Sequence, residues 1–593
     1  MNATDLAARV QALLDAGRPD DALAEATRWT ARRPGDAAGH LAVAHVWLAR
    51  GQRDRALLAA ERAHRLAPEI PGVLALLGGL LVAAGRAAEA EPLLRRACDI
   101  DPLQTEARAG LCAALMALRR LRDAAEIAES GLELCPADAG LLQRRGEAAL
   151  LMGHADLAVE LLGAAALRAP ESLEIARSLA FAGNYDSTEA GRIAAVHGAH
   201  GRLMTEATVA PAGWTPARAG PGQAPPEPLT IGLLSPDLRD HPVGRFALPL
   251  LRHLDRSRFR IVGLAAHRSD DGVARELRGL ADDWCDALPA ASAELARLIR
   301  QRNIDVLIDL AGLTSGHRLD VFPLRPAPLQ GTYRGYPATT GLASADFRLG
   351  ESATDPPGAP ATGPERLVRL DPCLVCWRVP REAPEVRARR PGPIVFGSFN
   401  NLAKIGGRVI GLWARVLNAV PGSVLAVKAL GLRDGPTAEM LVARLHGAGI
   451  AQERLRLLAP TERYADHLAQ YESMDIALDT FPYHGTTTTC EALSMGVPVV
   501  SRAGDLHAGR VGVSLLRAVG LSDLACNDDE AFVSAAAALA GDASRLARLR
   551  AELRGRVEHG PLGDERAFAA RFGEAVLSAW RAAAGVRAEG DGP

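Results

Sequence analysis

The chain has 593 residues, with 48% hydrophobic residues, 23% charged residues and a formal net charge of −2. This length exceeds what one core can hold, so we expect two to four domains of ordinary globular composition. A net charge this close to zero argues against a nucleic-acid binder that works by neutralising phosphates.

The sequence also gives expectations about the compartment. Residues 1–6 lack a basic region followed by an apolar stretch, so no signal peptide is predicted. No run of about 18 uncharged apolar residues occurs, so no membrane span is predicted. Eight scattered cysteines suit a reducing compartment, and we expect a cytoplasmic protein. Cys373 and Cys376 form the only CxxC; small buried apolar residues explain it better than a metal or redox site, and we predict no metal.

Residues 1–170 carry an internal repeat of 34 residues. Three markers share this spacing: a glycine, an alanine and a proline, with Arg119 at the one place where the glycine is missing. The markers are Gly17, Gly51, Gly85 and Gly153; Ala22, Ala56, Ala90, Ala124 and Ala158; and Pro34, Pro68, Pro102, Pro136 and Pro170. The pattern predicts helix–turn–helix repeats, with each glycine in a turn, each alanine at a close helix contact and each proline after the second helix.

These residues resemble five tetratricopeptide repeats. Such a stack buries a continuous core and presents a concave groove. We expect the groove to bind a protein or peptide partner; a spacer or a homodimer contact is the alternative.

Residues 171–228 form a transition. Helical patterning persists to about Thr208, and residues 209–228 then contain six prolines among glycines and alanines, which is typical of a linker.

Alternating apolar strands and helices follow and predict two parallel α/β units, residues 229–390 and residues 391–593. Their expected strands are 229–234, 259–265, 305–310, 394–399, 423–428, 454–458, 475–478 and 498–500. Their expected helices are 293–302, 409–418, 438–446, 531–540, 543–554 and 565–583. Open α/β sheets bind ligands at the carboxyl ends of their strands, and a cleft between two such units suits a large ligand.

Four polar clusters come directly after apolar strands: residues 237–244, 312–316, 400–404 and 479–489. In the last cluster a Pro/Gly turn leads into four threonines that open a helix. Free N–H groups and the helix dipole favour a phosphate at such a point, and the hydroxyls of Thr486, Thr487, Thr488 and Thr489 add donors. An ordinary capped helix is the alternative.

Single residues, inside and outside these clusters, also suggest roles. Lys404 and Lys428 are the only lysines, and a compact ammonium suits a diphosphate oxygen. His241 precedes a proline near a strand end and could accept a proton, or could simply bond to its loop. His467 could stack on a base or bond a ribose. Glu491, one turn past the threonines, could accept ribose hydroxyls or be an exposed helix carboxylate.

Several motifs are absent from the sequence. It has no P-loop, no dinucleotide fingerprint after the first strand, and no Asp-x-Asp after a strand for a metal diphosphate. This favours a metal-independent site in which Lys404 and helix N–H groups balance the charge of a leaving group.

Nearly the whole chain resembles the O-linked N-acetylglucosamine transferase and SPINDLY group of protein glycosyltransferases. The matching segments are Asp240-His-Pro242, Arg325-Pro-Ala-Pro-Leu-Gln330, Gly335-Tyr-Pro337, Thr339-Thr-Gly341, residues 396–404, the threonine loop, Gly496-Val-Pro-Val-Val500, Gly504-Asp-Leu-His507 and Arg510-Val-Gly512.

The resemblance implies a GT-B fold, two Rossmann-like lobes, and inverting, metal-independent transfer from a nucleotide sugar to Ser or Thr. It implies that Lys404 and Asn401 contact the diphosphate and that Thr486, Thr487 and Thr488 hold it. His467 would meet the base, Glu491 the ribose, and His241 the reacting sugar as base or orienter.

The resemblance leaves the donor open. UDP-N-acetylglucosamine is the expected donor, with no other cofactor. The threonine loop is nearer to the SPINDLY branch, whose members can transfer fucose from a guanine nucleotide, and Tyr464 stands where the N-acetylglucosamine branch tends to carry a lysine. A related enzyme with another donor, such as an O-fucosyltransferase, and a non-catalytic repeat scaffold are the alternatives.

Overall fold

The structure is a computed structural model that describes residues 2–286, 288, 291–389 and 391–585. The predicted boundary at residue 390 and the predicted end at residue 593 lie outside the described residues. The chain divides into a repeat unit, Met1–Met152 with Leu157–Pro170, and an α/β unit, Gly153–Asp156 with Glu171–Pro593. Among the described residues, no helix is both long and apolar enough to cross a bilayer.

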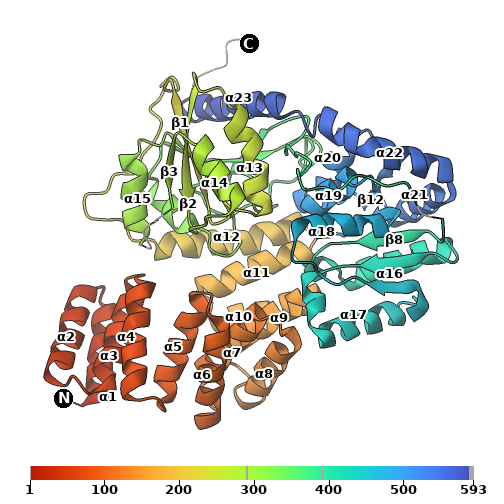
Figure 1. Cartoon of the computed structure of the whole chain (residues 1–593). Coiled ribbons are helices and arrows are strands. Elements are labelled where there is room, and N and C mark those ends of the chain that lie inside the picture. The colour runs from red at the N-terminus through yellow and green to blue at the C-terminus, as the bar shows by residue number, and fades with distance from the viewer. Residues whose placement is uncertain (1, 287, 289–290, 390, 586–593) are drawn as a thin grey trace. The chain divides into compact units, whose positions relative to one another are not determined.

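The repeat unit consists of successive antiparallel helices, coloured red to orange in Figure 1. They are α1 (Ala3–Asp15), α2 (Pro19–Arg32), α3 (Ala37–Ala49), α4 (Arg53–Leu66), α5 (Pro71–Ala83), α6 (Ala87–Ile100), α7 (Thr105–Ala117), α8 (Leu121–Leu134), α9 (Ala139–Leu151) and α10 (Ala155–Arg168).

The sequence markers take the predicted places in these helices. Each proline follows the second helix of a pair, and every alanine marker has 0% exposure, as close helix contacts require. The four marker glycines lie in turns with positive φ. Arg119, at the missing glycine, also adopts positive φ, 65°, so the repeat geometry overrides the preference of this residue.

The α/β unit begins with α11 (Leu173–Asp186) and α12 (Ala190–Ala207), which confirm the helical patterning of the transition. Both helices contact the same tyrosine of the unit. His197 Nε2 lies 2.7 Å from Tyr336 Oη, and Asn184 donates to that oxygen as well. Gly201 and Gly341 approach so closely that a Cβ on either would collide with the backbone of the other segment.

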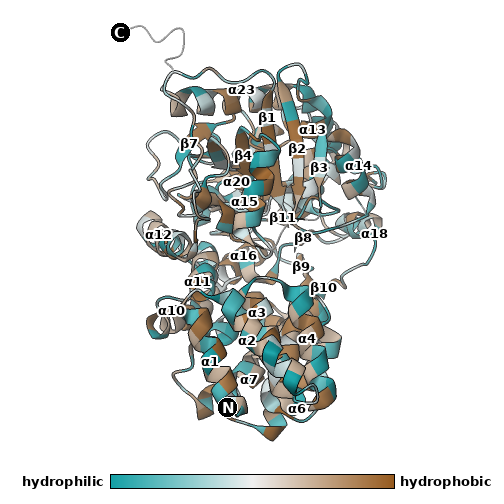
Figure 2. Ribbon diagram, turned by 90° about the vertical axis from the view of Figure 1, so that its left-hand side faces the viewer, coloured by the Kyte–Doolittle hydropathy of each residue, from teal (hydrophilic) through white to brown (hydrophobic). Residues whose placement is uncertain are grey.

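The first lobe holds a parallel sheet of seven strands in the order β3-β2-β1-β4-β5-β6-β7. The strands are β1 (Leu229–Ser235), β2 (Phe259–Ala265), β3 (Asp283–Cys285), β4 (Val306–Asp309), β5 (Leu329–Thr332), β6 (Phe347–Gly350) and β7 (Arg366–Arg369). The helices are α13 (Pro242–His253), α14 (Gly272–Leu280) and α15 (Ser292–Gln301). Strand β1 is buried along its length and is largely brown in Figure 2, as expected of a strand covered on both faces.

The second lobe holds a parallel sheet of six strands in the order β10-β9-β8-β11-β12-β13. The strands are β8 (Val395–Ser398), β9 (Val424–Val427), β10 (Leu455–Leu457), β11 (Ile476–Leu478), β12 (Val499–Arg502) and β13 (Ala525–Cys526). The helices are α16 (Gly407–Ala419), α17 (Gly435–Gly447), α18 (Tyr464–Ala469), α19 (Thr487–Ser494), α20 (Val511–Ala518), α21 (Asp529–Gly541), α22 (Ala543–His559) and α23 (Glu565–Ala583). The last helix, α23, packs against α13 of the first lobe.

Every strand expected from the sequence is present within one or two residues. Five short strands were not predicted from the sequence: β3, β5, β6, β7 and β13. Two of these strands, β6 and β7, carry arginines, and β7 exposes two of its four residues, so they lack the continuous apolar run that marks a central strand.

Candidate functional site

The order of the strands locates a site in each lobe. In the first sheet the chain turns from β1 to β2 on one side and to β4 on the other, and in the second sheet from β8 to β9 and to β11. At such a switch point two neighbouring loops leave the sheet in opposite directions and open a crevice at the carboxyl ends of the strands. The four polar clusters predicted from the sequence follow β1, β4, β8 and β11.

Three of these clusters, all except residues 312–316, border one cavity of about 290 Å³, which we call the central cavity. Residues of both lobes line it. Six of the eight predicted site residues are among them: His241, Asn401, Lys404, Thr486, Thr487 and Thr488. The other two, His467 and Glu491, do not line it.

Lys404 points toward the turn that precedes α19. Its Nζ donates to the carbonyl of His484 at 2.7 Å and lies 3.9 Å from the centre of the Tyr483 ring. Burial lowers the pKa of Lys404 to about 8, while the Asp479 carboxylate acts in the opposite direction. A buried ammonium with one protein acceptor retains two N–H bonds for an anion in the cavity.

Helix α19 presents its N-terminus to the same cavity. The helix begins at Thr487, and no side chain of the described residues caps it. Its first N–H groups are therefore open to a ligand, as an anion site requires.

The threonines of this loop do not all face the cavity. Thr488 donates from Oγ1 to Asn400 Oδ1 at 3.1 Å. Thr489 is buried and donates back to the carbonyl of Gly485 at 2.9 Å, so its hydroxyl is used within the helix. This distinction follows from helical geometry, which turns successive side chains to different faces.

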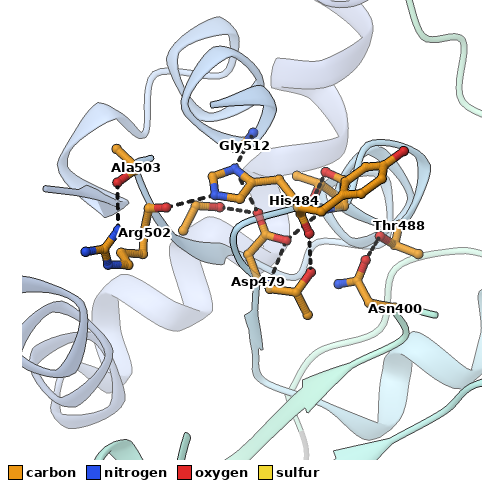
Figure 3. A network of polar contacts seen from close by, with 12 residues as sticks. Asn400, Asp479, His484, Thr488, Arg502, Ala503 and Gly512 are labelled. Atoms are coloured by element: carbon orange, nitrogen blue, oxygen red, sulfur yellow. Dashed lines mark hydrogen bonds and ion pairs between the residues drawn. The ribbon is translucent and has the colours of Figure 1, made fainter. Parts of the chain in front are cut away.

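Asp479 and His484 support the turn before α19 through hydrogen bonds (Figure 3). Asp479 accepts from the backbone N–H of Gly485 at 2.8 Å and from Ser501 Oγ at 2.6 Å. His484 accepts at Nδ1 from the N–H of Gly512 at 2.9 Å, so its Nε2 carries the proton and donates to the carbonyl of Arg502 at 2.8 Å. His484 is fully buried, and its ring serves the turn while its carbonyl serves Lys404.

His241 lies at the first-lobe side of the cavity. It is the N-cap of α13, and its Nδ1 accepts from the N–H of Val243 at 3.3 Å. Burial lowers the pKa of His241, while Asp237 acts to raise it. The structural role weighed from the sequence, a histidine bonded to its own loop, is therefore present, and the ring still lines the cavity.

His467 and Glu491 belong to a separate network in the second lobe. Lys428 Nζ lies 2.7 Å from His467 Nδ1, and His467 Nε2 lies 2.9 Å from Glu491 Oε2. Glu491 also accepts from the hydroxyls of Tyr464, at 2.7 Å, and Tyr471, at 3.0 Å. Glu491 is buried, so the alternative of an exposed helix carboxylate is wrong.

Lys428 joins the network as its cation. Burial lowers its pKa to about 8, with Glu491 opposing the shift. Tyr464, which stands where the resemblance leads us to expect a lysine, belongs to this network: its hydroxyl donates to Glu491, and the Arg245 guanidinium lies over its ring at 4.2 Å.

Several other residues that line the central cavity were given no role from the sequence, among them Asn400, Tyr483 and His507. Asn400 and His507 had a usable signal, since each follows a strand end, β8 and β12, where ligands bind. Tyr483 lies inside the turn, and only the three-dimensional path of that turn shows that its ring supports Lys404.

The two cysteines of the CxxC motif are small buried residues, as predicted. Cys373 and Cys376 are both buried and unpaired, and burial raises the pKa of Cys373 to about 12. Neither thiol is poised for chemistry.

Two parallel α/β lobes that line one cavity define the GT-B class of fold. The family model for glycosyl transferase family 41 matches residues 193–371 and 388–572, and the chain belongs to this family. A tetratricopeptide repeat model matches residues 81–139.

Known proteins resemble the chain to different degrees. A variant of Thermobaculum terrenum O-GlcNAc transferase has a structure with a TM-score of 0.73 and 32% identity, covering 93% of this chain and 98% of that one. The probable UDP-N-acetylglucosamine–peptide N-acetylglucosaminyltransferase SPINDLY of Arabidopsis thaliana is 38% identical over 364 residues, covering 60% of this chain and 40% of the relative. The corresponding Arabidopsis protein SEC is 26% identical over 365 residues, 59% of this chain and 37% of the relative. The chain thus spans about two fifths of the length of these curated relatives.

Proposed function

We propose that this protein is an inverting, metal-independent protein O-glycosyltransferase that moves N-acetylglucosamine from UDP-N-acetylglucosamine to Ser or Thr of target proteins. One observation carries the proposal: the Lys404 ammonium and the open N-terminus of α19 line the same cavity. Donors placed in advance around a developing negative charge are a major source of catalysis. Here they would meet the diphosphate as the sugar leaves.

The other predicted residues fit this arrangement by position. Asn401 and Thr486 to Thr488 line the cavity beside Lys404, where a diphosphate would lie. The network of Lys428, His467 and Glu491 includes Tyr471, whose hydroxyl oxygen also lies 3.2 Å from the Thr488 carbonyl oxygen, so the network adjoins the helix tip. We assign the base to His467 and the ribose to Glu491.

Replacing Lys404 with alanine tests the proposal. Loss of one preorganised donor lowers kcat by about 10²–10³-fold in comparable sites, and we expect that range for Lys404→Ala. Arg456→Ala is the matched control, because Arg456 is an exposed cation on β10 of the same lobe and lines neither the central cavity nor its neighbours. Unchanged turnover in Lys404→Ala would reject the assigned role.

The donor has a second candidate. The identity to SPINDLY, 38%, is higher than the identity to SEC, 26%, and Tyr464 stands in place of a lysine. Both features are nearer to the SPINDLY branch, whose members can transfer fucose from a guanine nucleotide, so GDP-fucose is the second candidate. Because a bound ligand stabilises the native state by about 2.7 kcal/mol at a hundred times its Kd, thermal unfolding with a panel of nucleotide sugars separates the two. Larger stabilisation by the guanine nucleotides than by the uridine nucleotides would replace UDP-N-acetylglucosamine as the donor.

The acceptor would be a polypeptide recruited by the repeat unit. Intact-mass measurement of candidate acceptors after incubation with each donor tests this. A mass gain of one sugar is expected, and no gain with any donor would favour a non-catalytic scaffold.

A further inference from the structure

Two histidines line the central cavity, and their hydrogen bonds fix the ring proton on different nitrogens. In His241, Nδ1 accepts from the backbone N–H of Val243, so the neutral ring carries its proton on Nε2. The Asp237 carboxylate lies 3.7 Å from that Nδ1, too far for a hydrogen bond. The second nitrogen of His241 is therefore a donor and has no lone pair to accept a proton.

His507 has the opposite arrangement. Its Nδ1 lies 2.7 Å from Asp355 Oδ2. Although burial acts to raise it, the His507 ring and the Arg348 guanidinium hold the pKa of the Asp355 carboxyl well below its usual range. An ionised carboxylate only accepts hydrogen bonds, so the proton must be on Nδ1 of His507.

Arg348 completes this group. Its Nη2 donates to Asp355 Oδ1 at 2.8 Å, and its Nη1 lies 3.2 Å from His507 Nδ1. Since that nitrogen already carries the proton shared with Asp355, we take the Arg348 interaction to act on the carboxylate. In the neutral ring Nε2 keeps a free lone pair, and no described residue is recorded as its hydrogen-bond partner.

His507 also lies where two cavities meet. A second cavity of about 260 Å³, the side cavity, shares Pro337, Thr354 and His507 with the central cavity. The side cavity is lined by polar residues that the donor site does not use, among them Asn184 and Glu365. A residue that borders both spaces can contact a donor in one and an acceptor that enters from the other.

From this geometry we propose that His507 is the catalytic base and that the side cavity receives the acceptor side chain. The inference rests on the proposed glycosyl transfer. Nε2 of His507 takes the proton of the acceptor hydroxyl while the oxygen of that hydroxyl forms a bond to the anomeric carbon of the sugar. The bond from that carbon to the diphosphate oxygen breaks, and its electron pair leaves with the nucleoside diphosphate, whose charge Lys404 and α19 stabilise. The proton then passes from His507 to solvent.

His241 takes a different part in this scheme. Its Nε2–H can donate to an oxygen of the sugar or acceptor, and it orients without accepting the proton. The two roles separate by experiment because asparagine reproduces the δ position of histidine and lacks Nε2.

The experiment compares the same substitution at three positions in the full chain: His507→Asn, His241→Asn and His446→Asn. In His507→Asn the amide can still donate to Asp355, so the contact between the lobes is kept while the base is lost. In His241→Asn the amide oxygen can still accept from Val243. His446 is exposed near the end of α17 and is the control.

Transfer rates are measured against pH with the best donor from the panel, and UDP or GDP affinity is measured in parallel. Loss of a general base lowers the rate by about 10²–10⁴-fold, so we expect His507→Asn to lose at least about 100-fold in kcat with unchanged nucleotide affinity. The fall of the transfer rate toward acidic pH, the acidic limb of the pH profile, should disappear in His507→Asn. His241→Asn and His446→Asn should keep that limb. The charged groups that face His507 are Asp355 and Arg348.

The outcomes separate the two proposals. A His507→Asn variant that keeps the acidic limb, or that loses rate only together with nucleotide affinity, would show a structural contact between the lobes and overturn this inference alone. A wild-type chain that transfers sugar from no donor would overturn the proposed function and this inference with it.

Discussion

Helices α13 and α19 begin at corresponding edges of the two sheets and line the same cavity, yet their N-termini differ. In α13, Pro242 at the first position has no N–H, and the N–H of Val243 is taken by the His241 ring. In α19 no side chain of the described residues caps the first turn. A helix tip whose first donors are absent or already bonded offers fewer N–H groups to a phosphate than an open tip does.

Under the proposed function, this difference between the two helix N-termini gives the two lobes different tasks. The second lobe supplies backbone donors and the Lys404 ammonium, which suit a diphosphate of any nucleotide sugar. The first lobe supplies side chains, His241 among them, which suit the sugar and the acceptor. An open tip also needs support from behind, and the ring of His484 and the carboxylate of Asp479 provide it.

The largest effect should come from disrupting the hydrogen bonds by which Asp479 and His484 support the turn before α19. A Cβ at position 512 would lie 2.4 Å from Ser501 Oγ, 2.6 Å from Asp479 Oδ2 and 2.7 Å from His484 Nδ1. All three atoms are buried in the network, so Gly512→Ala must displace it, and we expect Tm to fall on the order of 5 °C with loss of nucleotide binding.

The control is Gly411→Ala. A Cβ at Gly411, on the exposed side of α16, meets nothing within 4 Å. Alanine is the better helix former there, so Tm should stay the same or rise slightly. Equal behaviour of the two variants in thermal unfolding would contradict the supporting role of the network.

A smaller effect concerns pH. The lowered pKa of Lys404, about 8, means that the free protein loses this ammonium as pH rises through 8. A bound diphosphate favours the protonated form, so binding takes up a proton in this range and Kd for the nucleotide should rise, by at most about tenfold per pH unit. Titration calorimetry at pH 7, 8 and 9 in buffers of different ionisation enthalpy measures both quantities.

Lys404→Arg isolates the source of this dependence. An arginine stays protonated throughout, so its variant should show a flat Kd across the same range. Because Lys428 also has a pKa lowered to about 8 and remains in that variant, an unchanged slope would move the effect to Lys428.

How much of the fold could be predicted from the sequence depends on how regular the sequence pattern is in each unit. In the repeat unit every marker has a local cause, such as the positive φ at Gly17 or the close packing at Ala22, and the pattern predicts the helices. Even Arg119 follows the period, because its neighbours impose the turn. In the α/β unit the buried central strands are equally visible, whereas edge strands such as β7 are not.

The candidate site is predictable where it follows a strand and less so where it depends on contacts across the fold. Lys404 and the threonine loop follow β8 and β11, and their position in one cavity agrees with that rule. His507 also follows a strand, but what distinguishes it is Asp355, 152 positions away in the other lobe. A single sequence does not show which carboxylate faces which histidine.

The smallest expected effect concerns the capped helix of the first lobe, α13, which we compare with the open helix α19. His241→Ala removes the cap of α13 and should cost about 1 kcal/mol, seen as a fall in Tm of a few degrees at most. His241→Asn should restore the cap, since asparagine is among the best N-cap residues. Both variants should bind UDP or GDP as the wild type does, because the proposed nucleotide site is at α19. If instead His241→Ala weakened nucleotide binding while His241→Asn restored it, the capped helix would also hold the diphosphate, and the division of tasks between the two lobes would be wrong.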